Sequence, residues 1–472
     1  RLMTSQVDVM GFSVSFEIDF LGIFDILEKR SIPLKAKDRT EDHPIVFGGG
    51  PVLTANPEPY CEFFDFIIIG DAENIDTSII DVIKANKHLP KSEVLKIVAE
   101  IKGIYVPSLT EYDETKGVTK NDGELLCIEK FSASLSKCIS TPVLSEKSFF
   151  ANTFVIEIVR GCPQRCGFCL ASYLNLPARF CDYDQIITGI DFGLKYTNKI
   201  ALLGALITAH PRFDDICRHI LKRKEDIPDL ELSVSSLRAD SISPVIIQTL
   251  VACGQKHSTI AIEAGSERLR KLINKNLSEK QIFETVKTAY ENGLKGLKIY
   301  AMIGHPTETK HDIDEMIALA KKLKTSFKDF DFTFSFATFV PKSHTPFQFC
   351  ERESVKSLEQ KYEYLKKEFH KLGVKIRTSS VKWDYWQALI SRGDRRLCDY
   401  LVAVYKDGAN LGAFKQTYKN MYKQKLLPPS EEYALRKRDI NENLPWDFIK
   451  MPPSKEALIK EYQRLLGECN KV

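Results

Sequence analysis

Three cysteines lie within eight residues of one another, Cys162, Cys166 and Cys169, in the segment RGCPQRCGFCLASY. Thiolates this close repel: at 4 Å and an effective dielectric constant of 20, each pair costs about 4 kcal/mol. Such a group is compatible only with metal cations among the sulfurs or with some thiols protonated. Ligation of an iron–sulfur cluster meets that requirement. Three ligands on a four-iron cluster leave one iron without protein coordination, which is typical of a catalytic metal site.

Two other interpretations of these cysteines remain open. Cys166 and Cys169 have the Cys-x-x-Cys spacing of a redox pair, with Cys162 incidental. A zinc site would need a fourth ligand, and no His or Cys follows at zinc-finger spacing, since the next histidine is His210.

The composition sets the class of protein. The 472 residues are 43% apolar and 28% charged, which argues against a disordered or collagen-like chain. Lys and Arg number 67 against 63 Asp and Glu, too small an excess to require a polyanionic partner. No run of eighteen apolar residues predicts a membrane span. Because Arg1 lies inside what reads as a folded segment, we expect the natural N-terminus to be missing.

Cysteine usage indicates the compartment. Twelve cysteines in so long a chain are not the density of a disulfide scaffold, and three of them are clustered. This distribution suits a reducing environment, so the expected location is a cytoplasm low in oxygen.

The first 95 residues alternate apolar strands with helical patterns, which predicts a parallel sheet with ligands at the strand ends. VDVMGFSVS (7–15), PIVFGGG (44–50) and FDFIIIGDAE (64–73) read as strands. The glycines that end the second strand either let a ligand approach the backbone or make a tight turn. Residues 96–150 read as a connector.

A regular rhythm of strands and helices runs from 151 to 345 and predicts a barrel or partial barrel. The expected strands are 153–159, 199–206, 230–236, 258–265, 296–304 and 332–341. Helices are expected between them, including 278–293, which opens on a Ser N-cap, and 311–324. The cysteine cluster directly follows the first strand, where such folds place their sites.

Residues 346–472 read as a helical C-terminal region. They carry 25 Lys and Arg against 17 Asp and Glu. We interpret most of these charges as solvated faces, and a nucleic-acid partner is not expected.

The cysteine segment, with aromatic Phe168 just before the third Cys and a strand before the first, resembles the radical SAM superfamily. FGGGP (47–51), SVSSLRADSI, IAIEAGSERLRKLINK, LKIYAMIGHPTET and FVPKSHTPFQ extend the resemblance to radical SAM proteins with an N-terminal cobalamin-binding-type domain, and KWDYWQALISRGDRR resembles one branch of that group. The resemblance implies an α/β fold with a Rossmann-like domain (1–95, N-terminally incomplete), a connector (96–150), a partial (β/α)6 TIM-type barrel (151–345) and a helical C-terminal region (346–472).

The resemblance also implies cofactors. Cys162, Cys166 and Cys169 would hold a 4Fe–4S cluster whose open iron is chelated by the amino and carboxylate groups of S-adenosylmethionine (SAM). One electron would then cleave SAM to a 5′-deoxyadenosyl radical that abstracts hydrogen from a substrate. The reductant would be an electron donor such as flavodoxin or ferredoxin, and Phe168 would pack near the adenine.

Further SAM contacts are expected at the strand ends. Gly204 and Ala205 occupy the end of the second strand, where many relatives have a Gly-Gly-Glu that holds the SAM amino group. The glutamate is missing here, so backbone carbonyls would make any such contact. Ser236 and Arg238 follow the third strand, and Arg238 suits either the SAM carboxylate or a structural ion pair.

The later strand ends offer two further groups. Glu263 lies inside an apolar strand and needs a partner, either SAM or one of Arg238 and Arg268. Gly304, before His305, would shape the backbone around adenine, and His305 reads as a structural histidine.

Cobalamin is a possible further cofactor. Ser13, Ser15, Gly48 and Gly49 match strand-end positions of the family's cobalamin domain. The Asp-x-His-x-x-G loop that supplies the axial histidine in the family is not found before them, so either it precedes Arg1 or this branch lacks it.

The leading interpretation is a radical SAM enzyme with an unidentified substrate, with methyl or other carbon-group transfer if cobalamin binds. One alternative is a methylthiotransferase, whose second cluster needs three N-terminal cysteines; Cys61, Cys127 and Cys138 do not have matching surroundings. The other alternative is a non-catalytic iron–sulfur protein that senses or regulates.

Overall fold

The computed structural model describes residues 7–73, 75–114 and 117–467. The chain divides into two units that interleave along the sequence. The first unit contains the residues up to Ala133, Val340–Arg352 and Lys382–Tyr462. The second contains Ser134–Phe339, Glu353–Val381 and the residues from Gln463 onward. Among the described residues, no helix has the length and apolar character needed to cross a bilayer.

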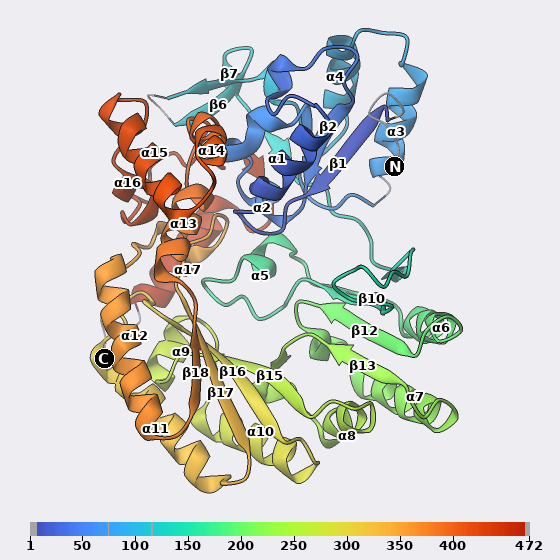
Figure 1. Ribbon diagram of the computed structural model, residues 1–472, viewed down its shortest axis with the longest axis vertical. Coiled ribbons are helices and arrows are strands. Elements are labelled where there is room, and N and C mark those ends of the chain that lie inside the picture. Colours follow the sequence, from blue (N-terminus) through green and yellow to red (C-terminus); the bar gives the residue numbers. More distant parts are fainter. Residues whose placement is uncertain (1–6, 74, 115–116, 468–472) are drawn as a thin grey trace. The chain divides into compact units, whose positions relative to one another are not determined.

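The first unit is built on a four-stranded sheet in the order β1-β2-β3-β4 (Figure 1). Its strands are β1 (Val9–Ser13), β2 (Ile45–Gly49), β3 (Phe66–Ile68) and β4 (Ile104–Tyr105). The first three strands run parallel and β4 is antiparallel to β3. The helices of this part are α1 (Phe20–Lys29), α2 (Pro51–Ala55), α3 (Ile75–Ala85) and α4 (Lys91–Ala99). The predicted alternation of strands and helices is therefore found here.

Smaller elements from several segments of the chain complete this unit. The short strands are β5 (Glu111–Asp113), β6 (Val118–Asn121), β7 (Glu124–Leu125), β8 (Ile128–Glu129) and β19 (Ile449–Lys450), the last pairing with β8. The 3-10 turns are η2 (Ala36–Asp38), η3 (Glu58–Phe63), η4 (Pro107–Leu109) and η7 (Pro346–Phe349).

The C-terminal helices form a group with an aromatic core. They are α13 (Val381–Ser391), α14 (Leu397–Lys406), α15 (Leu411–Lys423) and α16 (Ser430–Ala434), and α17 (Lys455–Gly467) follows them in the chain outside this group. The rings of Trp386, Tyr400, Phe414 and Tyr418 pack together, with centroids 5.1 to 6.2 Å apart. The predicted helical character of 346–472 is correct for most of its length.

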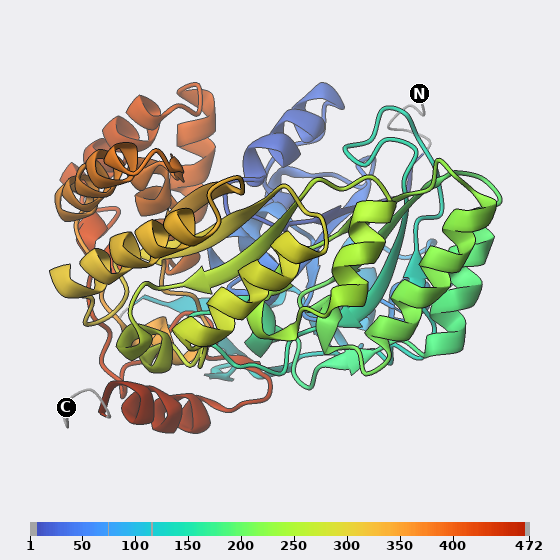
Figure 2. The same cartoon turned by 90° about the horizontal axis from the view of Figure 1, so that it is seen from below.

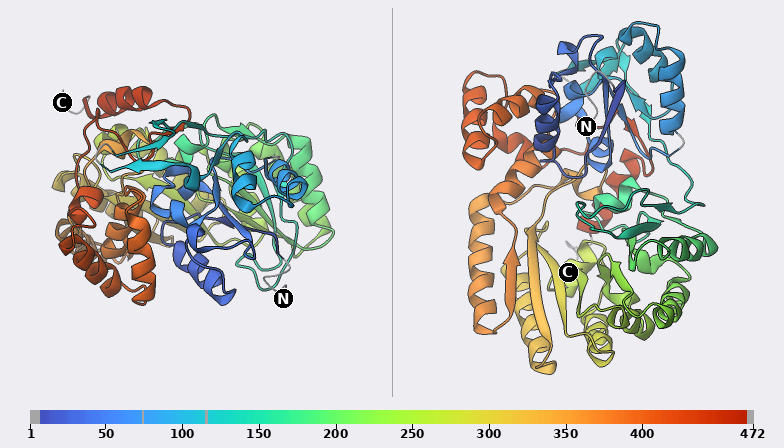
Figure 3. Two further views of the ribbon diagram at one scale, coloured as in Figure 1. Left: turned by 90° about the horizontal axis from the view of Figure 1, so that it is seen from above. Right: turned by 45° about the vertical axis from the view of Figure 1, so that its right-hand side comes forward.

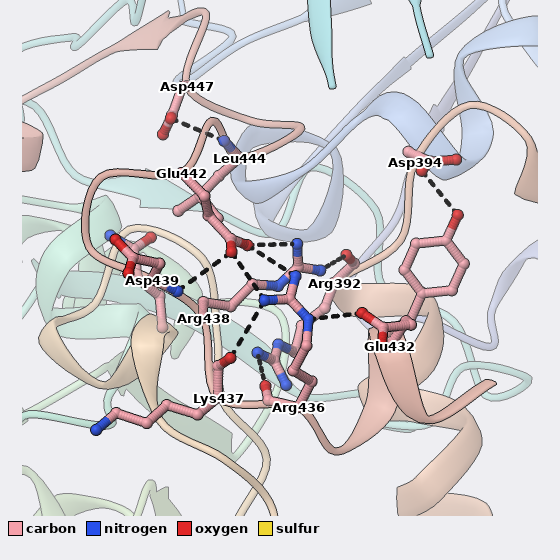
Figure 4. A network of polar contacts seen from close by, with 12 residues as sticks. Arg392, Asp394, Glu432, Arg436, Lys437, Arg438, Asp439, Glu442, Leu444 and Asp447 are labelled. Carbon is pink, nitrogen blue, oxygen red and sulfur yellow. Dashed lines mark hydrogen bonds and ion pairs between the residues drawn. The ribbon is translucent and has the colours of Figure 1, made fainter. Parts of the chain in front are cut away.

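An ion-pair network fixes the loop after α16 (Figure 4). The Glu442 carboxylate accepts hydrogen bonds from Arg436 at 2.8 and 3.0 Å and from Arg438 at 3.1 Å. Arg438 also donates to the backbone carbonyl of Arg392 at 2.9 Å. Burial, reinforced by the two neighbouring arginines, lowers the pKa of Arg392 to about 9. The arginines of this region therefore serve its internal structure.

The second unit contains two largely parallel sheets. The first has the order β11-β10-β12-β13, with β9 also pairing with β10, and the second has the order β14-β15-β16-β17-β18. The strands of the first sheet are β9 (Ile139–Ser140), β10 (Phe154–Arg160), β11 (Arg179–Phe180), β12 (Lys199–Gly204) and β13 (Glu231–Val234). Those of the second are β14 (Leu237–Arg238), β15 (His257–Glu263), β16 (Gly296–Ile303), β17 (Asp331–Thr338) and β18 (Lys375–Thr378).

Helices cover one face of these strands (Figure 2). They are α6 (Tyr183–Gly193), α7 (Phe213–Asp226), α8 (Pro244–Ala252), α10 (Glu279–Glu291), α11 (Lys310–Ser326) and α12 (Val355–Lys371). The unit also contains the short helices α5 (Leu170–Leu174) and α9 (Glu267–Leu272) and the 3-10 turns η5 (Ile207–Ala209) and η6 (Ala239–Ser241). Ser278 caps α10 through a capping box with Gln281, as the sequence predicts. Figure 3 shows α12 running beside β18.

The fold class expected from the sequence is confirmed. All six strands predicted between 151 and 341 exist, and β15 and β17 alternate buried and exposed side chains as half-buried strands do. Cys138 and Cys181 form a disulfide in the second unit that the sequence analysis did not foresee. The proposed boundaries at 95, 150 and 345 stay predictions.

Gly265 generates a stability prediction for the second unit. A Cβ at this position would lie 2.3 Å from the backbone nitrogen of Met316 in α11. We expect Gly265→Ala to lower the free energy of unfolding by about 2–3 kcal/mol, because helix backbone must shift. The control is Gly22→Ala in α1, where a Cβ meets nothing within 4 Å and helix propensity predicts a gain of about 1 kcal/mol. Denaturant unfolding of both variants checks this; equal effects would contradict it.

Candidate functional site

The cysteine segment begins where β10 ends. Arg160 is the last residue of the strand, and Gly161 follows with φ +85°. A side chain at Gly161 would meet the carbonyl oxygen of Asn175 at 2.4 Å, so this turn requires glycine. Cys162 comes next, and Cys169 stands at the N-cap of α5. The chain thus leaves the strand end in a tight loop that carries all three cysteines.

The end of α9 holds this loop in place. The backbone N–H of Gly167 donates to the Ile273 carbonyl at 2.9 Å. The Asn274 side chain donates to the carbonyls of Gln164 and Arg165 at 3.2 and 2.8 Å. Arg165 and Asn274 both have positive φ, +53° and +57°. The loop conformation therefore depends on residues about 110 positions away in the sequence.

The three thiols form one electrostatic group. Burial raises the pKa of Cys166 to about 12, while the cation of Lys275 acts to lower that pKa and a charged Cys169 would raise it. Burial also raises the pKa of Cys169, and a charged Cys162 would add to that shift. Without a bound cation, Cys166 and Cys169 are therefore neutral thiols at pH 7.

Glu263 occupies a strained turn at the end of β15. Its φ is +68°, and Ala264 N–H donates to the Ile262 carbonyl at 2.9 Å across it, which makes a γ-turn. The register with β16 also shifts between Ala261 and Glu263. A non-glycine residue in this conformation costs about 1–3 kcal/mol and is typical of functional sites.

Lys275 is the partner of Glu263, with Nζ 3.4 Å from Oε1 and both side chains mostly buried. The two candidate partners considered from the sequence bind elsewhere. Arg238 Nε donates to Asp240 at 2.6 Å, and its Nη2 donates to the Lys275 carbonyl. Arg268 pairs with Asp312 at 2.5 Å. Sequence reasoning missed Lys275, which lies in an irregular segment, although the motif ending in LINK contains it.

Phe168 faces His305, with ring centroids 5.9 Å apart, and Phe339 lies on His305 at 6.1 Å. Burial lowers the pKa of His305 to about 4, and the backbone of Glu263 acts in the opposite direction. The imidazole is therefore neutral at physiological pH. Neither ring nitrogen makes a well-formed hydrogen bond within the described residues.

The loop that carries His305 is tied down by a buried carboxylate. Gly304, at φ +78°, donates its N–H to Glu308 at 2.9 Å, and Lys361 in α12 donates to the same carboxylate at 2.6 Å. The β15 and β16 ends are joined by a second network, in which Asp312 accepts from Arg268, Ser266 and the backbone of Thr309.

The remaining expected contacts of the second unit lie at strand ends. The Gly204 carbonyl accepts from Ser235 Oγ at 3.0 Å, Ala205 is exposed, and Ser236 is half-buried between β13 and β14. The structure thus gathers the cysteines, Arg238, Glu263 and Lys275 into one group and Phe168 with His305 into another. The SAM roles of all these residues stay predictions.

The residues proposed for cobalamin lie in the first unit. Ser13 ends β1 and pairs with Gly49 in the parallel register, and Ser15 is exposed. A Cβ on Gly48 would meet the protein's own Leu53 at 2.5 Å. Gly48 is therefore needed for internal packing, while Gly49, whose nearest neighbour would be 3.7 Å away, has room.

Comparison with known proteins decides the family. An uncharacterized protein of Methanocaldococcus jannaschii is 30% identical over 398 residues, 84% of this chain and 80% of the relative. The family described as "Radical SAM superfamily" matches residues 156–320, and "Radical SAM proteins, N-terminal" matches residues 2–107. The chain belongs to the radical SAM superfamily. It is therefore an enzyme, and its family implies a 4Fe–4S cluster and SAM.

Two further relatives extend this comparison. An uncharacterized methyltransferase of Pyrococcus horikoshii is 24% identical over 68% of both chains. The solved structure of OxsB, a cobalamin-dependent SAM radical enzyme, covers 100% of this chain and 72% of its own at TM-score 0.50 and 16% identity. That likeness concerns the fold alone.

The residues present fit the cluster that the radical SAM family implies. Three thiols share one loop, and Cys166 and Cys169 become thiolates at neutral pH only if a cation offsets their burial. Within the described part of the chain, no three metal-binding side chains gather tightly enough for a single ion. In a cluster each cysteine binds a different iron.

The Asp312 network generates a pH prediction. Hydrogen bonds from Arg268, Ser266 and Thr309 outweigh burial and lower the pKa of Asp312 to about 2, from an ordinary 3.8. The ionised Asp312 carboxylate therefore contributes fully to the free energy of unfolding above about pH 4, and this contribution is lost as the pH falls toward 2. We expect Asp312→Asn to lower the free energy of unfolding by about 2 kcal/mol at pH 7, with the difference from wild type shrinking in acid.

Urea unfolding across this pH range measures the effect. Asp329→Asn, which removes an exposed carboxylate outside the network, is the matched control. A wild-type advantage that stayed constant down to pH 2 would rule out the role given to Asp312.

Proposed function

We propose that Cys162, Cys166 and Cys169 hold a 4Fe–4S cluster and that the chain cleaves SAM reductively to a 5′-deoxyadenosyl radical, which acts on a substrate still to be identified. The observation that carries the proposal is the placement of the Cys166 and Cys169 thiols within electrostatic range of the oppositely charged pair Glu263 and Lys275, with Cys162 next to Cys169.

The cluster, when bound, supplies an open iron and one electron. The chain's contribution begins with the cysteine loop, whose shape is preset by Gly161 and by the hydrogen bonds from Asn274, just after α9. A loop fixed before loading loses little conformational entropy when iron binds.

Glu263 and Lys275 suit the amino-acid end of SAM, which carries an ammonium and a carboxylate. The carboxylate of Glu263 would accept from the ammonium, and the Lys275 cation would bind the carboxylate. The 3.4 Å gap between Nζ and Oε1 is at the long end for an ion pair, so exchanging it for two ligand contacts costs little. Arg238, already bonded to Asp240, supports Lys275 through its carbonyl.

Phe168, Gly304 and the neutral His305 suit the adenine end, where aromatic faces and free backbone groups are needed. Gly204, Ala205 and Ser236, at the ends of the first sheet, remain candidates for further SAM contacts.

Cobalamin receives partial support. The solved enzyme with this fold binds it, Ser13 and Ser15 are exposed, and Gly49 has room beside it. Gly48 is explained by packing against Leu53, and no histidine occurs in the chain before His43. No step of the proposed reaction is assigned to cobalamin.

The methylthiotransferase alternative needs a second cluster from three N-terminal cysteines. Cys138 is in a disulfide with Cys181, Cys61 is fully buried and Cys127 is exposed. This arrangement favours a single cluster. A non-catalytic sensing protein would not need the Glu263–Lys275 pair. The electron donor and the cytoplasmic location remain part of the proposal.

Anaerobic iron and sulfide reconstitution followed by dithionite and SAM tests the function. We expect the wild type to show cluster absorbance and to release 5′-deoxyadenosine. Cys166→Ala should lose both, since one ligand of three is removed, whereas Cys253→Ala, a buried free cysteine outside the loop, should keep both. A clustered wild type without SAM cleavage would favour sensing, and a Cys166→Ala protein with full cleavage would refute the assignment.

Lys275 gives a second test at the same site. We expect Lys275→Met to raise the Kd for SAM about tenfold or more, the loss expected for one charge-assisted contact, while iron content is unchanged. Lys275→Arg should keep part of the affinity, and Lys280→Met, on an exposed position of α10, should keep all of it. Equilibrium dialysis with labelled SAM measures the Kd; an unaltered value in Lys275→Met would remove this residue from the site.

A further inference from the structure

Helix α15 presents a row of lysines on the surface of the C-terminal helices. Lys415, Lys419 and Lys423 recur every four residues, and all three are exposed, as is Lys425 just beyond the helix. At 1.5 Å per residue, successive lysines are about 6 Å apart along the helix and lie within one quarter of its circumference. The row is therefore a continuous cationic line.

No carboxylate interrupts this line. The chain contains no Asp or Glu between Asp407 and Glu431. Among the residues that the structure describes, none of the four lysines forms an ion pair, and Asp407 is bonded to Thr417 on the inner side of α15. By contrast, Lys366 and Lys371 of α12 pair with Glu363 and Glu368.

Such a row costs stability when nothing binds it. Like charges at i and i+4 repel one another and destabilise a helix. The nearby Arg436 and Arg438 are not free in this way, because both donate hydrogen bonds to Glu442 (Figure 4). The lysines of α15 are thus cationic side chains without an internal structural use.

The apolar face of α15 is already occupied. Phe414 packs on Trp383 and Trp386, and Tyr418 packs on Tyr400. A helix that enters a lipid surface needs a free apolar face, so this geometry disfavours a membrane partner.

The residues between the lysines are polar or aromatic. Gln416, Asn420 and Gln424 are exposed amides, and Tyr422 is 48% exposed beside Lys419 and Lys423. Lysines contact phosphates, amides donate to phosphate and sugar oxygens, and an exposed tyrosine can stack on a base.

We propose that the outer face of α15 binds the phosphodiester backbone of a nucleic acid. The charge count of residues 346–472 gave no reason to expect a nucleic-acid partner. That count includes arginines paired with carboxylates, whereas the structure gathers unpaired lysines on one face of α15. The proposal goes beyond the radical chemistry and stands independently of the cluster.

Fluorescence anisotropy with a labelled oligouridine RNA, across a series of KCl concentrations, tests it. The full-length wild type should bind with a salt-dependent Kd. Replacing Lys415, Lys419 and Lys423 by Gln should weaken binding about tenfold or more and reduce the slope of log Kd against log salt by about 2 to 3, the value for three lost phosphate contacts.

The matched control replaces Lys366, Lys367 and Lys371 of α12 by Gln, which removes the same charge from another surface helix, and it should leave the Kd within about twofold. The α15 variant should unfold at an equal or higher temperature than wild type, since repulsion is relieved. No RNA binding by the wild type, equal losses in both variants, or α15-dependent binding to phosphatidylserine vesicles in place of RNA would overturn the proposal.

Discussion

The placement of three neighbouring thiols in one loop at a strand end, with Cys166 buried and the other two partly buried, is the constraint on which the candidate site depends. Burial raises the pKa values of Cys166 and Cys169, so both thiols are neutral when no iron is bound. A bound cation lowers these pKa values again and favours the thiolates. The loop must therefore be shaped by contacts other than sulfur. Gly161 and the hydrogen bonds from Asn274 provide that shape and link the loop after β10 to the segment after α9.

The same segment connects the cysteines to Glu263. Asn274 binds the loop, and the next residue, Lys275, pairs with the strained carboxylate. The γ-turn at Glu263 is stabilised by its surroundings, because Ser266 and Arg268 bind Asp312 directly after it. Strain of this kind persists only where neighbouring contacts fix the backbone on both sides. Moving any of these residues would therefore disturb both the loop and the charged pair.

The sequence predicted those features that depend on local patterns. Apolar runs located the strands of the second unit, Ser278 marked a helix start, and the spacing of Cys162, Cys166 and Cys169 indicated a cluster. Lys275 was missed because its role arises from a long-range approach between an irregular segment and a strand end. The positive φ of Glu263 and the Cys138–Cys181 disulfide likewise follow from tertiary structure, which no local pattern encodes. For Arg238 the sequence left the SAM carboxylate and a structural ion pair open, and in the structure its donors face Asp240 and a backbone carbonyl.

The interleaving of the two units along the sequence has a consequence for biosynthesis. Nearly all of the second unit lies before Lys382, whereas the first unit draws on segments at both ends, including Lys382–Tyr462. During translation the sheet of the first unit can pack against its own helices early, because that core lies within residues 45–106. The helices that Lys382–Tyr462 adds to the same unit are made only after nearly all of the second unit. A chain stalled near residue 380 would thus hold nearly all of the second unit and only part of the first.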